Sequence, residues 1–286
     1  MIKNNIQLPH SDIIKNDVES CIEEDVKDGD LTANLIPETA TINGKIIARE
    51  SGVICGQAWA KEAFYQVDST IETDWQVNDG VEVHDQAVIC EIRGNARTIL
   101  TAERQALNLL QTLSGTASVA RQYVQEISHT KAKLLDTRKT IPGLRDAQKY
   151  AVLAGGGHNH RMGLYDGILI KENHLRCGKS LEDVVKTALT SVPEGTLVEL
   201  EVERLEQMER GIAAGIKRVL LDNFSLDELR EAVQVNQDRI DLEASGNVSI
   251  ETIKSIAETG VDYISSGAIT KHVKALDLSL LFDLNI

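Results

Sequence analysis

From Lys133 to near the end of the chain, short apolar segments alternate with helical segments in a regular series. Ser180 and Ser225 each precede an acidic residue by three positions, which is a helix-start signal. Such repetition is typical of parallel strands joined by crossover helices, and no GxGxxG motif follows the first strand. A closed eight-stranded barrel needs about 250 residues, so we expect an incomplete, six-stranded, open α/β barrel. The predicted strands lie around Leu134–Leu135, Ile168–Ile170, Val198–Val202, Val219–Leu221, Ile240–Leu242 and Tyr263–Ser265.

The sequence before residue 115 has a different character. Strand-like and helical stretches are mixed there, and residues 70–92 alternate and break as hairpins do. A long helical run begins near Thr101 and crosses a break at Ser114–Gly115. This pattern predicts a mixed α/β sandwich domain with antiparallel strands. The predicted domains are residues 1–114, to which the tail of about 273–286 is a candidate to return, and a barrel catalytic domain over 115–272.

Charge and cysteine spacing exclude several classes of protein. The chain has 30 basic and 44 acidic residues, a net charge of −14, which disfavours binding to nucleic acid or to anionic membranes. The four cysteines form no CxxC or CxxH pair, so a zinc site or disulfide framework is not expected. The first residues lack the apolar stretch of a signal peptide, and no apolar run reaches about 18 residues. We predict a soluble, cytoplasmic protein.

Polar or ionisable residues follow every predicted strand. Active sites of parallel α/β barrels lie at the carboxyl ends of the strands, where the loops converge. One polar strand end can simply meet water, but six together predict a functional site. The segments are Asp136-Thr137-Arg138-Lys139, Lys171, Glu201, Asp222-Asn223, Ser245-Gly246-Asn247 and Ser266-Gly267-Ala268.

The charged residues at this predicted site are of two kinds. Glu201 and Asp222 are hard oxygen ligands suited to Mg²⁺ held jointly with substrate phosphates. An exposed strand face is the alternative for Glu201, because VELEVE alternates. The cations concentrate positive charge in an acidic protein, and arginine matches carboxylate or phosphate in a bidentate way. They are Arg138, Lys139, Arg161 and Lys171.

Small residues complete the predicted site. The segments Ser245-Gly246-Asn247 and Ser266-Gly267-Ala268 offer free backbone N–H groups at the last two strand ends, where barrels commonly bind phosphate. The glycine run at Gly155–Gly157 follows a helix, so we interpret it as a connection that delivers His160 and the next residue to the site. We interpret His158 as a residue on the surface of a loop. A metal site formed by His158 and His160 would lack a third ligand nearby in the sequence. The residues alone predict a small polyanionic substrate, a phosphate group and magnesium, and leave the reaction open.

Blocks of sequence at these same residues resemble the quinolinate phosphoribosyltransferase family, also called carboxylating nicotinate-nucleotide pyrophosphorylase. The central block over residues 136–174, DTRKT…GLR…GGGxNHR…KENH, is long and specific. The resemblance implies transfer of phosphoribosyl from phosphoribosyl pyrophosphate to quinolinate with decarboxylation, in the biosynthesis of NAD. It also implies Mg²⁺ as cofactor and a homodimer. Further similar blocks are EEDVKDGDLTANLIP, TAERQALNLLQTLSGTAS, VELEVE, VLLDN and YISSGAITKHVKALDLSL.

The resemblance assigns roles to individual residues. It implies that Arg104 reaches the quinolinate pocket of the other protomer. It places Lys139 near pyrophosphate and ribose, and Glu201 and Asp222 at the ribose and Mg²⁺; with Lys171 these are the implied catalytic residues. The chain departs from many family members after SSGAIT, where Lys271 and His272 replace a single histidine. The implied substrate-binding set is Arg104, Thr137, Arg138, Lys139, His160, Arg161, Lys171, Glu201, Asp222, Ser245, Gly246, Asn247, Ser266, Gly267 and Ala268.

Three other functions stay open at this point. Lys171 at a strand end is placed as a Schiff-base lysine of a barrel lyase would be. A related phosphoribosyltransferase could act on a different small aromatic anion. A phosphate-binding sensor or an inactive scaffold could use the same fold, although every alignable site position holds a competent residue.

Overall fold

The computed structural model describes residues 6–177 and 180–282. The chain forms two compact units, which we describe separately. The first comprises residues 1–121, 141–156 and 272–286, and the second comprises residues 122–140 and 157–271. Among the described residues, no helix combines the length and apolar character needed to cross a membrane.

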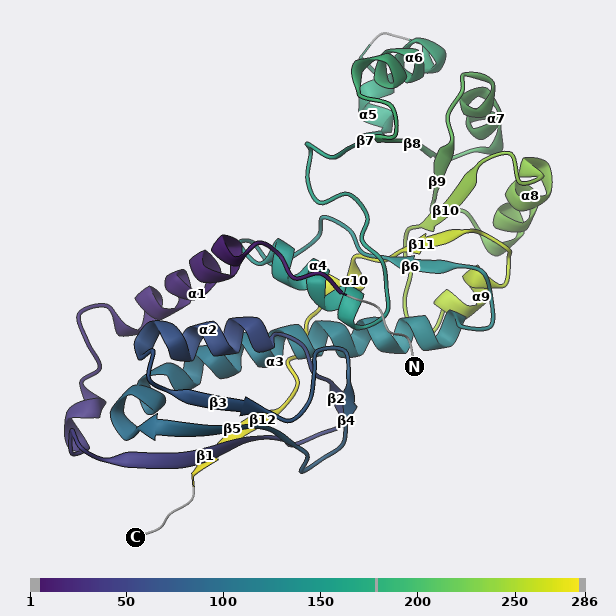
Figure 1. Ribbon diagram of the computed structural model, residues 1–286. Coiled ribbons are helices and arrows are strands. Elements are labelled where there is room, and N and C mark those ends of the chain that lie inside the picture. Colours follow the sequence, from purple (N-terminus) through teal and green to yellow (C-terminus); the bar gives the residue numbers. More distant parts are fainter. Residues whose placement is uncertain (1–5, 178–179, 283–286) are drawn as a thin grey trace. The chain divides into compact units, whose positions relative to one another are not determined.

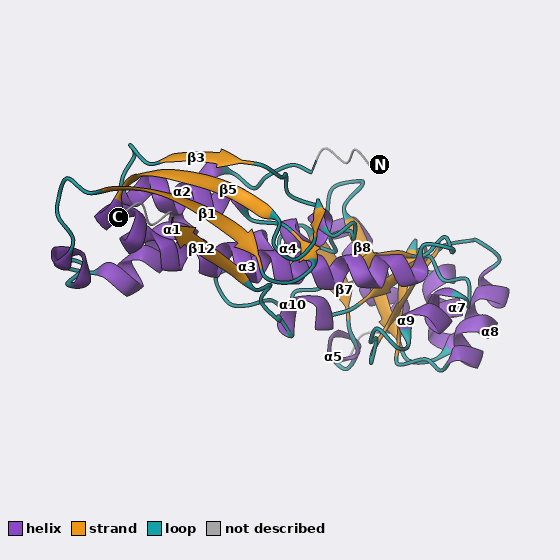
Figure 2. Ribbon diagram, turned by 90° about the horizontal axis from the view of Figure 1, so that it is seen from below, coloured by secondary structure: helices purple, strands orange, loops and turns teal. Residues whose placement is uncertain are grey.

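The first unit contains a four-stranded antiparallel sheet in the order β12-β1-β5-β3. Helices α1, α2 and α3 lie against one face of this sheet (Figure 2). The C-terminal strand pairs with β1, with Gly44 opposite Phe282. Residues 278–282 of the expected tail therefore lie in the N-terminal sheet, whereas residues 283–286 fall outside the described residues. The bounds are β1 Thr41–Ala48, β3 Glu72–Trp75, β5 Val88–Asn95, β12 Leu278–Phe282, α1 Ser11–Val26, α2 Gln57–Val67 and α3 Ala96–Ile127.

Smaller elements complete this unit. Residues 70–92 do not form one simple hairpin, because β3 pairs with β5 while β4 pairs with β2. Gly155 ends α4 and packs closely on α3, since a Cβ there would lie 2.5 Å from the carbonyl oxygen of Ala117. The unit's core is apolar and includes Trp59, Phe64, Ile46, Ile89, Ile99, Leu110 and Leu113. The bounds are η1 Thr32–Leu35, β2 Gly52–Val53, β4 Glu82–Val83 and α4 Arg145–Ala154.

Helix α3 differs from the prediction at both its start and its middle. It begins at Ala96, five residues before the predicted start, and it continues through Ser114–Gly115 without a break. The buried Ser114 hydroxyl donates to the carbonyl of Cys55 at 3.1 Å and accepts from its N–H at 2.9 Å. A Cβ on Gly115 would lie 2.1 Å from the carbonyl oxygen of Lys274. Both residues therefore serve packing within the first unit.

The second unit is a six-stranded parallel sheet in the order β6-β11-β10-β9-β8-β7. Helices follow its strands around the outside (Figure 1). Strands β6 and β7 are the two edges, so the sheet forms an open, incomplete barrel, as predicted. The strands are β6 Lys133–Leu135, β7 Gly167–Ile170, β8 Leu197–Val202, β9 Arg218–Asp222, β10 Asp241–Ser245 and β11 Tyr263–Ser265. The helices are α5 Glu172–Leu175, α6 Leu181–Ser191, α7 Leu205–Ala213, α8 Leu226–Asn236, α9 Ile253–Ala257 and α10 Ala268–Lys271.

The capping signals are where the sequence predicted them. Ser180 accepts from the N–H of Asp183, and Ser225 forms a reciprocal capping box with Glu228. The unit boundaries differ from the predicted ones at residues 115–121, 141–156 and 272. Residues 141–156, which carry α4, belong to the first unit and not to the barrel, because α4 contributes Tyr150 and its neighbours to the first unit's core.

Candidate active site

Side chains at alternate positions of the barrel strands point to its interior. Successive residues of a strand face opposite sides of the sheet, so Glu199 and Glu201 share one face of β8. Glu199 pairs in register with Arg218, and Glu201 pairs with Leu220. The alternation in VELEVE therefore places both glutamates inside the barrel, and the exposed-face interpretation of Glu201 is wrong.

A cavity of about 610 Å³ lies at the carboxyl ends of these strands, within the second unit. It brings together most of the sequence-predicted site residues, although they come from six separate segments. Those lining it are Thr137, Arg138, Lys139, His160, Arg161, Lys171, Glu201, Asp222, Ser245, Gly246 and Asn247. Leu169, Leu220, Asn223, Glu243 and Ser265 complete the lining.

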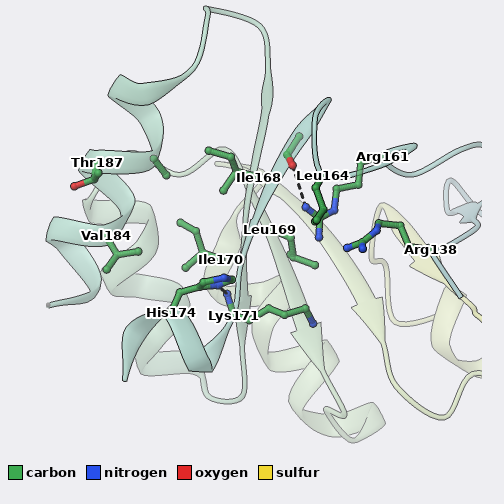
Figure 3. Close-up of a pocket in the computed structure, with 12 residues that line it drawn as sticks. Arg138, Arg161, Leu164, Ile168, Leu169, Ile170, Lys171, His174, Val184 and Thr187 are labelled. Carbon is green, nitrogen blue, oxygen red and sulfur yellow. Dashed lines mark hydrogen bonds between the residues drawn. The ribbon is translucent and has the colours of Figure 1, made fainter. Parts of the chain in front are cut away.

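One side of the cavity is cationic. The side chains of Arg138, Arg161 and Lys171 extend toward a common region (Figure 3). Burial lowers the pKa of the Arg161 guanidinium, and the neighbouring charge of Arg138 lowers it further. The Arg161 guanidinium donates from Nη1 to the carbonyl oxygen of Gly167 at 3.0 Å. The buried Nε of Arg138 has no hydrogen-bond partner among the described residues. An unpaired buried donor beside like charges fits a bound anion.

The opposite side of the cavity is acidic. Lys171 Nζ lies 2.5 Å from Glu201 Oε2, so the lysine joins the two sides. Burial raises the pKa of the Glu201 carboxyl, Lys171 opposes this shift, and the charge of Asp222 adds to it. Lys171 pairs with Glu201, while the neighbouring Asp222 carboxylate accepts a hydrogen bond from Asn223. The hard oxygens of two neighbouring carboxylates suit Mg²⁺. Lys171 Nζ is engaged with the Glu201 carboxylate, whereas a Schiff-base lysine must direct this nitrogen at a carbonyl carbon.

Small residues close the end of the cavity beyond β10. Gly246 adopts φ +95°, and a Cβ there would lie 2.2 Å from Asn223 Oδ1, so only glycine fits. Asn223 in turn donates to Asp222 Oδ2 at 2.9 Å and accepts from Asn247 Nδ2 at 3.3 Å. The Asp222 carboxylate is therefore held from the side that the Ser245-Gly246-Asn247 segment occupies.

The second small-residue segment lies beside Lys139. A Cβ on Gly267 would lie 2.7 Å from the Lys139 side chain, while the Ser266 hydroxyl is buried and donates to the Val248 carbonyl at 3.2 Å. Ser266, Gly267 and Ala268 do not line the cavity itself. The segment therefore lies next to the cavity, through the contact of Gly267 with Lys139 and through Ser265, the preceding residue, which lines the cavity.

The glycine run delivers His160 and Arg161 to the cavity, as its position predicted. The segment pairs with β6 through a parallel bridge between Leu135 and His158. The backbone N–H of His160 then donates to Asp136 Oδ1 at 2.9 Å. His158 itself does not line the cavity.

Two fully buried glutamates and a largely buried arginine behind His160 were not predicted from the sequence. Glu199 and Glu243 are fully buried, and Arg218 links them at 3.1 Å and 2.5 Å. Burial and the charge of Glu199 raise the pKa of Glu243 to about 7. Burial would also raise the pKa of Glu199, but the hydrogen bond from His160 and the charge of Arg218 lower it. The signal in the sequence was partial: Glu199 alternates with apolar residues inside a predicted strand, whereas Arg218 and Glu243 each lie one residue outside the predicted strand bounds.

His160, Glu199 and Glu243 offer ligand atoms within 4.8 Å of one another, which is compatible in distance with a metal ion. Arg218 contacts both carboxylates, however, and supplies the positive charge that a metal would bring. Two hydrogen bonds also engage both imidazole nitrogens. We therefore regard Glu201 and Asp222 as the better candidates for a cation site.

Arg104 lies on α3, in the first unit. Because the helix begins at Ala96, this residue lies in its third turn and not at its start. The unfavourable helix-dipole interaction that a first-turn arginine would experience therefore does not apply.

A second cavity, of about 550 Å³, shares Arg138, Arg161, Leu169 and Lys171 with the first. Its other walls are largely apolar and come from β7, α5, α6 and the segment that holds Leu164 (Figure 3). Arg138, Arg161 and Lys171 thus lie between the first cavity, which is polar, and the second, which is largely apolar. A flat ring that carries carboxylates would meet both charge and apolar surface there.

Comparison with known proteins identifies the class. The chain is 46% identical to the nicotinate-nucleotide pyrophosphorylase from Francisella tularensis, with a TM-score of 0.94 over 98% of this chain and all of that structure. It is 40% identical to a probable carboxylating nicotinate-nucleotide pyrophosphorylase of Bacillus subtilis, over 90% of this chain and 89% of the relative. A decarboxylating quinolinate phosphoribosyltransferase of Nicotiana tabacum is 38% identical over 94% and 82% of the two chains. Fold and site thus define a phosphoribosyltransferase with an open α/β barrel.

The family models narrow this class further. The quinolinate phosphoribosyl transferase C-terminal domain matches residues 116–281, and the N-terminal domain matches residues 30–114. The chain belongs to the quinolinate phosphoribosyltransferase family.

Proposed function

We propose that this enzyme transfers the phosphoribosyl group of phosphoribosyl pyrophosphate to quinolinate, with loss of carbon dioxide and pyrophosphate, to form nicotinate mononucleotide. The observation that carries the proposal is the cavity in which Arg138, Arg161 and Lys171 face Glu201 and Asp222. The three cations would bind a dicarboxylate. The two carboxylates would hold Mg²⁺ beside a pyrophosphate ester. Family membership supplies the reaction that joins them.

The acid binds at the cationic side. Quinolinate carries two carboxylates on adjacent ring carbons, and a planar guanidinium can hold each of them in a bidentate way. The Arg138 Nε lacks a partner among the described residues, so an incoming carboxylate removes the cost of a buried unsatisfied donor. A monocarboxylate would leave part of this positive charge unmatched.

Phosphoribosyl pyrophosphate occupies the acidic side and the small-residue end. Glu201 and Asp222 would hold Mg²⁺, with the Ser245-Gly246-Asn247 segment near the 5′-phosphate. The bound metal supplies charge stabilisation for the departing pyrophosphate. Lys139 contributes a cation on the same side, and Glu201 and Asp222 face the positive charge that develops at ribose C1.

No dedicated base is required in this mechanism. The ring nitrogen of quinolinate attacks ribose C1, and the bond from C1 to the pyrophosphate oxygen breaks. The nitrogen then carries positive charge, so the adjacent carboxylate leaves as carbon dioxide and its electron pair stays on the ring carbon beside that nitrogen. A proton from solvent completes the product. Lys171 and the two arginines orient the acid for attack.

We infer that the active unit is a homodimer in which Arg104 of one protomer completes the acid pocket of the other. This rests on the match of TAERQALNLLQTLSGTAS to the family. We also infer a reducing, cytoplasmic location, which is compatible with four cysteines that are all free in the described chain.

Turnover of a small substrate panel tests the proposal. The purified protein is incubated with phosphoribosyl pyrophosphate, Mg²⁺ and either quinolinate or nicotinate, and both pyrophosphate and carbon dioxide are measured. We expect equimolar release of both with quinolinate and no reaction with nicotinate. Comparable turnover of the two acids, or pyrophosphate without carbon dioxide, would contradict the assignment.

A further inference from the structure

Lys139 lines the polar cavity on the loop that follows β6. Among the described residues its ammonium forms no ion pair, whereas the ammonium of Lys171 pairs with Glu201. The direction of the Lys139 side chain is therefore not fixed by a carboxylate of the described chain. It depends on how the fold holds the main chain and the aliphatic stem of this residue.

The main chain of Lys139 is held by two threonine hydroxyls. Its N–H donates to Thr137 Oγ1 at 3.0 Å, and its carbonyl oxygen accepts from Thr270 Oγ1 at 2.8 Å. Thr270 is fully buried and lies in α10, directly after β11. Because β6 and β11 are neighbours in the sheet, this second hydrogen bond joins the loops at two adjacent strand ends.

The aliphatic stem of Lys139 lies against a glycine. A Cβ on Gly267 would lie 2.7 Å from Lys139 Cδ and 3.3 Å from Lys139 Cβ, so a side chain there would displace the stem. The backbone N–H groups of Thr270 and Lys271 donate to the Gly267 carbonyl at 3.4 Å and 3.0 Å. One turn, residues 267–271, therefore meets Lys139 at both its stem and its carbonyl.

We propose that Thr270 is a positioning residue whose buried hydroxyl aims the Lys139 ammonium at the departing pyrophosphate. Thr270 has no exposed surface and does not line the cavity, so the hydroxyl acts through Lys139 and not on the substrate. A cation that stabilises a leaving group must be in place before the reaction, since a displacement of about 1 Å can cost about a hundredfold in rate. The inference rests on the proposed function, in which Lys139 meets the pyrophosphate.

Two substitutions of Thr270 separate the hydroxyl from the volume of the side chain. Thr270→Val keeps the shape of threonine but removes the donor to the Lys139 carbonyl, whereas Thr270→Ser keeps the donor. We expect Thr270→Val to lower kcat about 10- to 100-fold with the KM for quinolinate nearly unchanged, and Thr270→Ser to stay within about threefold of the wild type. Wild-type activity in Thr270→Val, or equal losses in the two variants, would overturn the proposal.

A matched control measures the general effect of losing a buried hydroxyl. Thr259 is also buried and donates to the Ile256 carbonyl at 2.6 Å, so Thr259→Val should lower the melting temperature as Thr270→Val does but leave kcat unchanged. In a Lys139→Ala background, assayed at high enzyme concentration, Thr270→Val should reduce kcat no further, because both changes act through one cation. Multiplicative losses would show that Thr270 does not act through Lys139.

Binding of magnesium pyrophosphate separates this inference from the proposed function. Isothermal titration of the whole enzyme with pyrophosphate and Mg²⁺ requires no quinolinate. We expect Lys139→Ala and Thr270→Val to weaken this binding by similar factors, and Thr259→Val to leave it unchanged. If these differences appear but quinolinate is not turned over, the proposed function fails and the positioning role stands. Wild-type affinity in either Lys139→Ala or Thr270→Val would refute the positioning role.

Discussion

Arg161→Lys separates recognition of the acid from recognition of the sugar. The substitution keeps one positive charge at the cationic side of the cavity but removes the planar fork. In the wild-type chain one nitrogen of the fork binds the Gly167 carbonyl at 3.0 Å, while the rest of the fork remains available to a carboxylate. A lysine ammonium offers a point charge and cannot reproduce both interactions in one plane.

The expected loss is about 1–3 kcal/mol in quinolinate binding, the scale of a charge-assisted hydrogen bond. Since about 1.4 kcal/mol corresponds to a factor of ten, the Kd should rise about 5- to 150-fold. Because lysine keeps the positive charge, the substitution does not remove the repulsion from Arg138, and we expect no compensating gain from that source.

Isothermal titration with each substrate separately measures the effect. Phosphoribosyl pyrophosphate should bind Arg161→Lys as it binds the wild type. Arg204→Lys, an exposed arginine that precedes α7, serves as the matched control and should change neither affinity. An equal loss for both substrates would show that Arg161 does not distinguish the acid from the sugar.

Three further perturbations address the metal, the dimer and the buried network. Asp222→Ala should abolish Mg²⁺-dependent turnover with an unchanged melting temperature, and full wild-type activity in a chelator would contradict the metal role. Arg104→Ala and Lys139→Ala homodimers should each be nearly inactive. Mixed dimers of the two variants should regain about one active site per dimer, because one site carries both substitutions and the other carries neither. Verified mixed dimers without activity would exclude a shared site. Glu243→Gln should gain stability relative to wild type as pH rises from about 5 to 8, by up to about 3 kcal/mol in urea unfolding. The pKa of Glu243 in the folded protein is raised to about 7, so over this range the folded wild type retains a proton that the unfolded chain has released. The stability of the wild type therefore falls as pH rises. A stability difference between variant and wild type that does not change with pH would refute this prediction.

Local signals were sufficient for the positions of the barrel strands and less so for their ends. Apolar runs and capping residues predicted all six strands, because both depend on residues within a few positions of one another. The prediction for the fifth stopped at Leu242, whereas β10 continues to Ser245. Glu243 looks like a strand end in the sequence, but its side chain points into the barrel and pairs with Arg218 from the neighbouring strand.

Long-range contacts explain the features that the sequence did not predict. Ser114 and Gly115 resemble a helix break, yet their contacts are with Cys55 and Lys274, far away in the chain. The His160 ring likewise has a long-range partner, because its Nε2 lies 2.8 Å from Oε2 of Glu199, 39 positions later in the chain. The chemical character of the site could be predicted from residue types at strand ends, but the role of each residue depends on which partners the fold provides.

The return of the C-terminal strand to the first sheet has a consequence for synthesis on the ribosome. Strand β1 pairs on one side with β5 and on the other with β12, the last strand of the chain. The hydrogen-bonding edge of β1 therefore stays open while the entire barrel is translated, and an open edge invites pairing with other chains. The barrel has all of its strands before the first unit has its last, so the N-terminal part of this chain should complete folding after the middle part, and truncation before Leu278 should leave it prone to aggregation.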